Sequence, residues 1–340
     1  MKGVVAGKPG QLEYVEFPEP EIGPGEIIIA PEACGICSTD VKMVNKGGVE
    51  PRYALGHEVM GRIVAVDPDS TWKIGQRVVA SPYVSCGGCF YCLRGQPTLC
   101  TDLFANTLSP GGLAERIRIP ARLAERGVFA IPDDLPSETA ALAEPVGCVI
   151  KGLEDSGVRA GTAILIIGDG PMGLLSAGVA KAYGAYPVIV SGMTPHRMDT
   201  IKNTFADVVI DVNQADLRSE VERHTEGRGA DVVLVAVSTG EALRDGFNAV
   251  RPGGVVNSFA GVPEGTTVDL DIHWLHYQQV YLTGSFGVGS EHVDNAIRLL
   301  ASDRVDLASV ITGRFSFDQA PQAVEHAAKQ TGFKAMILFN

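Results

Sequence analysis

The densest group of metal-binding residues in this sequence is a cluster of four cysteines. Cys86, Cys89, Cys92 and Cys100 follow the pattern C-x2-C-x2-C-x7-C. Four thiolates at such spacing can form a tetrahedral Zn²⁺ site with Zn–S distances of about 2.3 Å. Because every ligand is a sulfur, no coordination position is left for a substrate, and we predict a structural zinc ion. An iron–sulfur cluster and a pair of disulfides are the alternatives.

A second group of metal-binding residues is spread along the first half of the chain. Cys37 supplies a thiolate, His57 an imidazole, and Glu58 and Glu144 supply carboxylates. A catalytic zinc ion uses three protein ligands and keeps one position open. From spacing alone this site is a hypothesis, because a lone histidine is more often structural and Cys34 with Cys37 could form a redox pair.

A glycine-rich G-x-G-x-x-G sequence follows an apolar run and precedes a helical pattern. Its glycines are Gly168, Gly170 and Gly173, with Pro171 and Met172 before the last. In this context the glycines make a tight turn, admit a pyrophosphate and let the helix pack closely on the strand. The free N–H groups of the helix N-terminus would bind the phosphates. We predict a dinucleotide site; the alternative is a turn without a ligand.

The end of the next expected strand bears on which dinucleotide binds. An Asp or Glu about 20 residues on would bind the ribose 2′-hydroxyl of NAD, but Gly192 occupies that position. Ser191, Thr194 and Arg197 could bind a 2′-phosphate instead. We therefore predict NADP in preference to NAD. The alternative is that Arg197 is a solvated helix residue and that NAD binds without the acid.

The apolar runs predict two kinds of domain. Before about residue 150 they are short and separated by Gly and Pro, which is typical of a β-rich domain. After about residue 160, apolar strands alternate with helices, which indicates a doubly wound parallel sheet of six strands. The expected early strands are 26–30, 61–66, 76–80 and 115–119, and the later ones 163–167, 187–191, 208–211, 231–237, 255–260, 280–285 and 335–339. The expected helices are 171–183, one from 195, 217–225, 241–250, 291–301 and 318–329.

Length, charge and cysteine count exclude several classes of protein. The 340 residues suggest two domains. The net charge of −12 opposes binding to nucleic acid or to an anionic membrane. The first residues contain no apolar run long enough for a signal peptide, and the apolar runs are far shorter than the ~20 residues of a membrane span, so we expect neither feature. An odd count of seven cysteines without an export signal opposes a disulfide framework. We expect a soluble, cytoplasmic protein.

Together and in order, these motifs resemble those of the zinc-dependent medium-chain alcohol dehydrogenases, most closely the polyol and threonine dehydrogenase branch. The resemblance covers essentially the whole chain and adds C-G-I-C-x-T-D at 34–40, G-H-E at 56–58, E-P-V at 144–146 and R-P-G-G at 251–254. It implies an α/β protein with a β-rich GroES-like catalytic domain, residues 1–148 and 288–340. A Rossmann nucleotide domain of residues 149–287 would lie between these two stretches.

The resemblance also implies two zinc ions per chain, one catalytic and one structural. Cys37 and His57 would bind the catalytic ion. Glu58 or Glu144 would be the third protein ligand, and the other would contact the zinc-bound water or exchange with it. Thr39 matches the hydroxyl that passes a proton outward in this family; the alternative is a threonine that caps a helix.

Two positions depart from the pattern of many relatives. Lys42 stands where many of them have an outer proton-accepting histidine, so the outer relay would run through water. Phe286, which the resemblance puts near the nicotinamide, is followed by Gly287 and Val288 rather than by the Arg-Tyr pair of sorbitol-type enzymes. A sorbitol-like mode of substrate binding is therefore not supported, and core packing is the alternative role for Phe286.

The implied function is hydride transfer between the secondary alcohol of a polyol, sugar or cyclitol and NAD(P), which gives a ketone. A threonine-type amino-alcohol dehydrogenase is the alternative within this class. A non-catalytic, nucleotide-binding redox sensor of the same fold is the alternative from another class. The expected partners are a small alcohol or ketone and further copies of the chain, in a homo-oligomer that family analogy makes a tetramer or a dimer.

Overall fold

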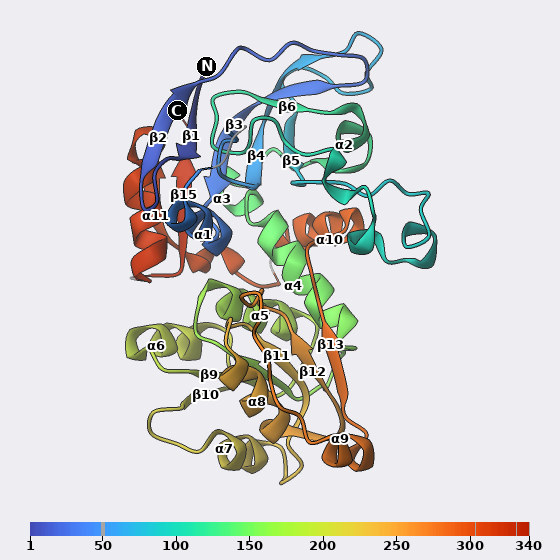
Figure 1. The fold of residues 1–340 in the computed structure, drawn as a ribbon, viewed down its shortest axis with the longest axis vertical. Coiled ribbons are helices and arrows are strands. Elements are labelled where there is room, and N and C mark those ends of the chain that lie inside the picture. Colours follow the sequence, from blue (N-terminus) through green and yellow to red (C-terminus); the bar gives the residue numbers. More distant parts are fainter. Residues whose placement is uncertain (49–51, 303, 331, 340) are drawn as a thin grey trace. The chain divides into compact units, whose positions relative to one another are not determined.

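The computed structural model describes residues 1–48, 52–302, 304–330 and 332–339 (Figure 1). The chain forms two compact units. Unit 1 comprises Met1–Gly147, Val288–Asp303 and Ala308–Asn340, and unit 2 comprises Cys148–Gly287 and Arg304–Leu307. Relative to the predicted division, Cys148 and the short segment 304–307 fall in unit 2.

A seven-stranded sheet with the order β14-β15-β3-β4-β5-β7, and with β6 also paired to β3, is the centre of unit 1. Its strands are β3 (Ile27–Gly35), β4 (Glu58–Val66), β5 (Arg77–Ala80), β6 (Ile117–Ile119), β7 (Val128–Ala130), β14 (Ile311–Ser316) and β15 (Lys334–Leu338). The fully buried Ile27, Ile29 and Ile63 of β3 and β4 belong to its apolar core. Because β15 pairs antiparallel with β3, two distant parts of the chain form one sheet.

The rest of unit 1 consists of a hairpin, helices and short 3-10 turns. The hairpin is β1 (Lys2–Ala6) with β2 (Leu12–Glu16). The helices are α1 (Ser38–Lys46), α2 (Ala121–Arg126), α3 (Ser137–Ala140), the start of α4 (Ala143–Asp155), α10 (Ser290–Leu300) and α11 (Ala320–Lys329). The 3-10 turns are η1 (Cys92–Arg94), η2 (Pro97–Leu99), η3 (Leu103–Ala105), η4 (Leu307–Val310) and η5 (Phe317–Gln319). Helix α1, which begins directly after the candidate metal ligand Cys37, packs beside α11 (Figure 1).

Unit 2 is a parallel sheet of six strands in the order β10-β9-β8-β11-β12-β13, and it confirms the predicted doubly wound fold. The strands are β8 (Ile164–Ile167), β9 (Val188–Gly192), β10 (Val208–Asp211), β11 (Ala230–Val235), β12 (Val250–Ser258) and β13 (Tyr281–Gly284). The intervening helices are α5 (Pro171–Ala182), α6 (Pro195–Thr204), α7 (Leu217–His224), α8 (Gly240–Ala249) and α9 (Ile272–Gln278). All four residues of β8 are buried, as the continuous apolar run predicted.

Two elements differ from the expected ones. Strand β12 begins at Val250 rather than at 255, because the strand continues through Pro252 and Gly253 with an irregularity in its register against β11. Helix α4 was not predicted; Pro145 lies in its first turn, where a missing N–H costs nothing. Across the described parts of the chain, no helix has the length and apolar character needed to cross a bilayer.

Candidate functional site

Three of the predicted catalytic-zinc ligands lie together in unit 1. The ligand atoms of Cys37, His57 and Glu58 are all within 4.8 Å of one another. Cys37 is the N-cap residue of α1, and Glu58 is the first residue of β4, directly after His57. The start of a helix and the start of a strand thus bring a thiolate, an imidazole and a carboxylate to one point, which is the donor set that zinc prefers.

Asp40 holds the two ligand-bearing segments together. Its Oδ2 accepts the backbone N–H of Cys37 at 2.8 Å, and its Oδ1 accepts that of Gly56 at 2.9 Å. Oδ1 also lies 3.8 Å from Nδ1 of His57. The Asp40 side chain is buried, so its charge acts on these partners with little screening by water. A carboxylate behind a ligating imidazole fixes the orientation of the ring.

A buried ion pair holds Glu58. Lys334 Nζ lies 2.7 Å from Glu58 Oε1 and 2.8 Å from Oε2, and it also donates to the carbonyl of Ile36 at 3.3 Å. Both side chains are nearly inaccessible, at 3% and 1% exposure. Gly35 is required beside this pair, because a Cβ at that position would lie 2.0 Å from Glu58 Oε2. The carboxylate is therefore held in place at the edge of the metal-ligand group.

Two more predicted site residues, Glu144 and Thr39, lie near the same group; Glu144 is buried and Thr39 is exposed. Glu144 is buried in the first turn of α4, and its carboxylate is outside the set of mutually close ligand atoms. Its charge nevertheless acts on His57 and on Lys334. Thr39 is exposed, and its Oγ1 lies 3.7 Å from Cys37 Sγ. An exposed hydroxyl therefore lies beside a ligand of the metal-ligand group.

The electrostatics of the site suit a cation. Burial by itself opposes the charged form of His57, but the negative charges of Asp40, Cys37 and Glu144 outweigh it and raise the pKa of His57 well above its ordinary value. Burial also opposes the charged form of the neighbouring Cys34 thiol and so raises its pKa, and the negative charges of Asp40 and Glu58 raise that pKa further. Several acidic groups around one imidazole fit a divalent metal ion.

The four-cysteine cluster forms a second group, also in unit 1. The sulfurs of Cys86, Cys89, Cys92 and Cys100 are mutually within 4.8 Å. Cys86 and Cys92 have their sulfurs 4.0 Å apart, and Cys89 and Cys92 have theirs 3.5 Å apart. A tetrahedron of sulfurs with 2.3 Å bonds to zinc has edges of about 3.8 Å. The cysteines are free thiols, not disulfides, and the spacing fits a closed zinc site.

Backbone N–H groups point at these sulfurs and lower their pKa values, whereas burial raises them, so the balance differs from one cysteine to the next. The N–H of Cys92 is the main cause that lowers the pKa of Cys89 to about 6. Burial is the main cause that raises the pKa of Cys100 to about 11, although the N–H groups of Cys86 and Asp102 oppose it at 3.3 Å each. The turn at Gly87, with a φ of 76°, allows the first two cysteines to face one another.

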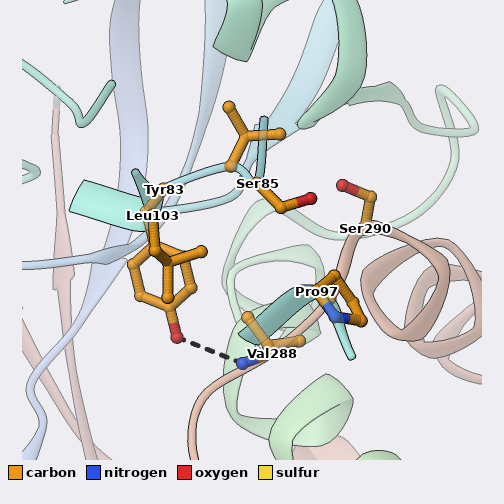
Figure 2. A pocket seen from close by; sticks show the side chains of 8 residues that line it. Tyr83, Ser85, Pro97, Leu103, Val288 and Ser290 are labelled. Carbon is orange, nitrogen blue, oxygen red and sulfur yellow. Dashed lines mark hydrogen bonds between the residues drawn. The ribbon is translucent and has the colours of Figure 1, made fainter. Parts of the chain in front are cut away.

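A small hollow lies beside the four-cysteine segment (Figure 2). Its walls include Ser85 and Pro97 from that segment, and the N–H of Val288 donates to Tyr83 Oη across it at 3.1 Å. Its empty volume is about 180 Å³, below the roughly 300 Å³ at which ligand pockets begin. No candidate metal ligand lines it. We therefore assign this hollow to packing.

The glycine-rich turn of unit 2 has the geometry of a phosphate-binding loop. Gly168 follows β8 with a φ of 131°, and Gly170 is the N-cap residue of α5, with Pro171 in the first turn. A Cβ at Gly170 would meet no atom within 4 Å, so the space above the helix N-terminus is open. A Cβ at Gly173 would lie 1.9 Å from the carbonyl oxygen of Gly168, so strand and helix pack in contact there. These glycines fit a pyrophosphate.

A carboxylate lies at the end of β9, although Gly192 occupies the position where one was sought. Asp169 Oδ2 accepts the N–H of Met193 at 2.9 Å and that of Thr194 at 2.7 Å. Sequence reasoning missed this residue because it occupies a variable position of the glycine motif. The same reasoning missed Lys334, because nothing local distinguishes it from a surface lysine.

The other predicted cofactor residues lie in different environments. Ser191 is buried in β9, and its Oγ has no hydrogen-bond partner among the described residues. Arg197 is buried in the first turn of α6, where burial lowers its pKa and the charge of Asp169 opposes that shift. Thr194 is the N-cap residue of α6. Phe286 is 57% exposed, so packing in a core is not its role within unit 2.

Comparisons with known proteins cover both units. The alcohol dehydrogenase GroES-like domain matches residues 23–133, and the zinc-binding dehydrogenase domain matches residues 171–302. Sorbitol dehydrogenase of Bacillus subtilis is 31% identical over 100% of this chain and 98% of its own. L-threonine 3-dehydrogenase of Pyrococcus horikoshii is 33% identical over 96% of this chain and 94% of its own. An alcohol dehydrogenase from Thermus sp. ATN1 shares the fold, with a TM-score of 0.91, full coverage of both chains and 24% identity.

Proposed function

Because this chain belongs to the zinc-dependent medium-chain alcohol dehydrogenases, we propose that it transfers a hydride between a secondary alcohol and a nicotinamide dinucleotide. The substrate class is a polyol, sugar or cyclitol, and the product of oxidation is a ketone. The observation that carries the proposal is the grouping of Cys37, His57 and Glu58, held by Asp40, in a chain that also has a pyrophosphate-binding turn. The relative named for sorbitol supports the substrate class.

The proposal includes two zinc ions per chain. One is structural and is bound by the four cysteines, whose sulfur spacing supports a tetrahedral site. The other is catalytic and is bound by Cys37, His57 and a glutamate. Glu58 is the glutamate that shares the ligand group, whereas Glu144 lies outside it and contributes its charge. We therefore favour Glu58 as the third ligand and Glu144 as the group that stands ready to exchange with it.

The residues around the catalytic site divide the remaining work. A bound zinc ion supplies Lewis acidity that lowers the pKa of a substrate hydroxyl, and a nicotinamide supplies the hydride acceptor. Asp40 orients His57 and the backbone before α1. Thr39, exposed and beside Cys37, moves the proton of the substrate hydroxyl outward. Lys42 stands where many relatives have a histidine that accepts the proton, so water carries the proton further.

Which of the two dinucleotides, NADP or NAD, this chain prefers stays a prediction. The sequence favours NADP, because Gly192 supplies no carboxylate and because Ser191, Thr194 and Arg197 could bind a 2′-phosphate. The position of Asp169 opposes that preference, because its carboxylate lies at the end of β9, where a 2′-phosphate would bind.

Two further expectations stay predictions. A homo-oligomer, either tetramer or dimer, is supported by the edge strand β13, where Tyr281 and Leu282 are exposed. A cytoplasmic location rests on the sequence, as does the absence of nucleic-acid and membrane partners.

The test combines substrate turnover with metal content. Purified protein is offered a panel of polyols, cyclitols and amino alcohols with NAD and with NADP, and nicotinamide absorbance is followed. The Cys37→Ala variant should keep one zinc ion per chain and lose turnover. Cys148→Ala is the matched control, because that cysteine is outside both ligand groups and should keep two zinc ions. A fully active Cys37→Ala variant would refute the proposal.

The same panel separates the alternative functions. Turnover of L-threonine or related amino alcohols, without turnover of polyols, would assign the threonine-type activity that the Pyrococcus relative's name suggests. Binding of dinucleotide and zinc with no turnover of any alcohol or ketone would favour the non-catalytic redox sensor instead.

A further inference from the structure

We propose that Asp169 sets the dinucleotide preference of this chain and makes it favour NAD(H) over NADP(H). Asp169 would act as the ribose-binding carboxylate that usually ends the second strand of such a sheet, although it comes from the turn after the first strand. The inference rests on the proposed function, because it assumes that unit 2 binds a nicotinamide dinucleotide.

The first observation is where the carboxylate lies. Asp169 follows β8, but its Oδ2 accepts the N–H groups of Met193 and Thr194, the two residues directly after β9. These bonds, at 2.9 Å and 2.7 Å, hold the carboxylate against the loop that follows the second strand. Oδ1 takes no part in them, and a ribose hydroxyl can donate to it. In a chain with Asp or Glu at position 192, the carboxylate of that residue would occupy the same place.

The second observation is the glycine at the end of β9. A Cβ at Gly192 would lie 2.5 Å from Asp169 Cβ and 2.6 Å from its Oδ2, which is closer than real Cβ atoms approach any neighbour. A side chain at 192 and the present position of Asp169 therefore exclude each other. The glycine does not mean that the carboxylate is missing; it makes room for a carboxylate from the adjacent strand end.

The third observation concerns the groups that would have to bind a 2′-phosphate. The N–H groups of Met193 and Thr194 already donate to Asp169. Arg197 is 3% exposed, and the negative charge of Asp169 acts on it and partly balances its positive charge. A phosphate of about two negative charges placed here would lie beside a carboxylate and would compete with it for these donors.

The experiment measures binding rather than turnover. Dissociation constants of NADH and NADPH are determined by calorimetry on the full-length wild type and on Asp169→Asn. Asparagine keeps one oxygen to accept from the loop N–H groups and removes the charge. Asp199→Asn is the matched control, because it removes one carboxylate from an exposed position of α6, two residues from Arg197. Thermal melting checks that each variant is folded.

We expect the wild type to bind NADH at least about tenfold more tightly than NADPH. NADPH would lose the hydrogen bond from the ribose 2′-hydroxyl to the Asp169 carboxylate, and its 2′-phosphate would be repelled by that carboxylate. Asp169→Asn should reduce that ratio by about tenfold, since the charge is the discriminating group. Asp199→Asn should leave the ratio unchanged. Equal or tighter binding of NADPH by the wild type would overturn the inference, as would an unchanged ratio in Asp169→Asn.

A second measurement does not depend on any variant. The wild type is titrated with 5′-AMP and with 2′,5′-ADP (adenosine 2′,5′-bisphosphate), which differ only by the 2′-phosphate. Tighter binding of 5′-AMP supports the role of Asp169, and tighter binding of 2′,5′-ADP overturns it. If the wild type bound neither dinucleotide, the proposed function would fail together with this inference. Binding of both dinucleotides with the wrong preference would overturn the inference alone.

Discussion

Replacing Lys334 by methionine should destabilise unit 1 by about 3–5 kcal/mol, because it leaves the Glu58 carboxylate buried without its partner. The two side chains are 3% and 1% exposed, and Nζ approaches both carboxylate oxygens, at 2.7 Å and 2.8 Å. At an effective dielectric constant near 20, a pair at this distance attracts by about 6 kcal/mol, and the cost of desolvation opposes this. Methionine has a similar length, so loss of volume contributes little.

A double-mutant cycle isolates the ion pair from other effects of the substitution. Glu58→Gln in the Lys334→Met background removes the unpaired charge, and we expect it to recover much of the lost stability. A zinc ion near Glu58 would also offset part of the uncompensated charge. The cost of Lys334→Met should therefore be near the lower end of the range in zinc-loaded protein and should increase after chelation.

The assay must report on unit 1 alone, and the chain offers a suitable probe. It has two tryptophans, Trp72 and Trp274. Trp72 packs against the core of unit 1 and donates from Nε1 to the carbonyl of Ala124 at 3.0 Å. In a Trp274→Phe background, urea unfolding followed by tryptophan fluorescence reports unit 1. A cost below about 1 kcal/mol with and without zinc, typical of an exposed pair, would refute the reasoning.

Two further predictions test the other sites. In chelator-treated protein at pH 7, Cys89, with a pKa of about 6, is mostly thiolate, whereas Cys100, with a pKa of about 11, is almost wholly protonated. Iodoacetamide should therefore label Cys89 faster than Cys100, as followed in peptide mass spectra, with zinc protecting both; equal rates would contradict this. Gly173→Ala, whose Cβ would meet the carbonyl of Gly168 at 1.9 Å, should cost about 1–3 kcal/mol and lower the melting temperature. Gly170→Ala, which meets no atom within 4 Å, should keep that temperature and weaken NADH binding, and a loss of fold there would count against the open turn.

The parts of the fold that sequence reasoning predicted best are those with a local pattern. Strand β10 (Val208–Asp211) has the predicted bounds, and α5 begins at the predicted Pro171. Here apolar residues bounded by polar turns, or a glycine turn followed by proline, determine the element from its own residues. The unpredicted α4 (Ala143–Asp155) lacks this signal, because Pro145 and Gly147 in its first half usually indicate a loop.

The candidate sites divide in the same way. The four cysteines lie close together in the sequence, so their grouping could be predicted from spacing. The contact between Lys334 and Glu58 spans 276 positions, and a buried lysine is rare enough that nothing local suggests one. Asp169 could not be predicted for a different reason. Gly192 looked like the absence of a carboxylate, and only the backbone geometry places the carboxylate of another residue there.

The pairing of β15 with β3 has a consequence for the order in which a ribosome produces the working parts of this protein. Residues 27–35 and 334–338 must meet to complete the sheet of unit 1, and all of the main segment of unit 2 is synthesised between them. Domains generally fold as units during synthesis. Unit 2 can therefore fold before β3 pairs with β15 and before the Glu58 carboxylate pairs with Lys334. The metal-ligand group that includes Cys37 and His57 gains its contact with Lys334 only after the main segment of unit 2 has been synthesised.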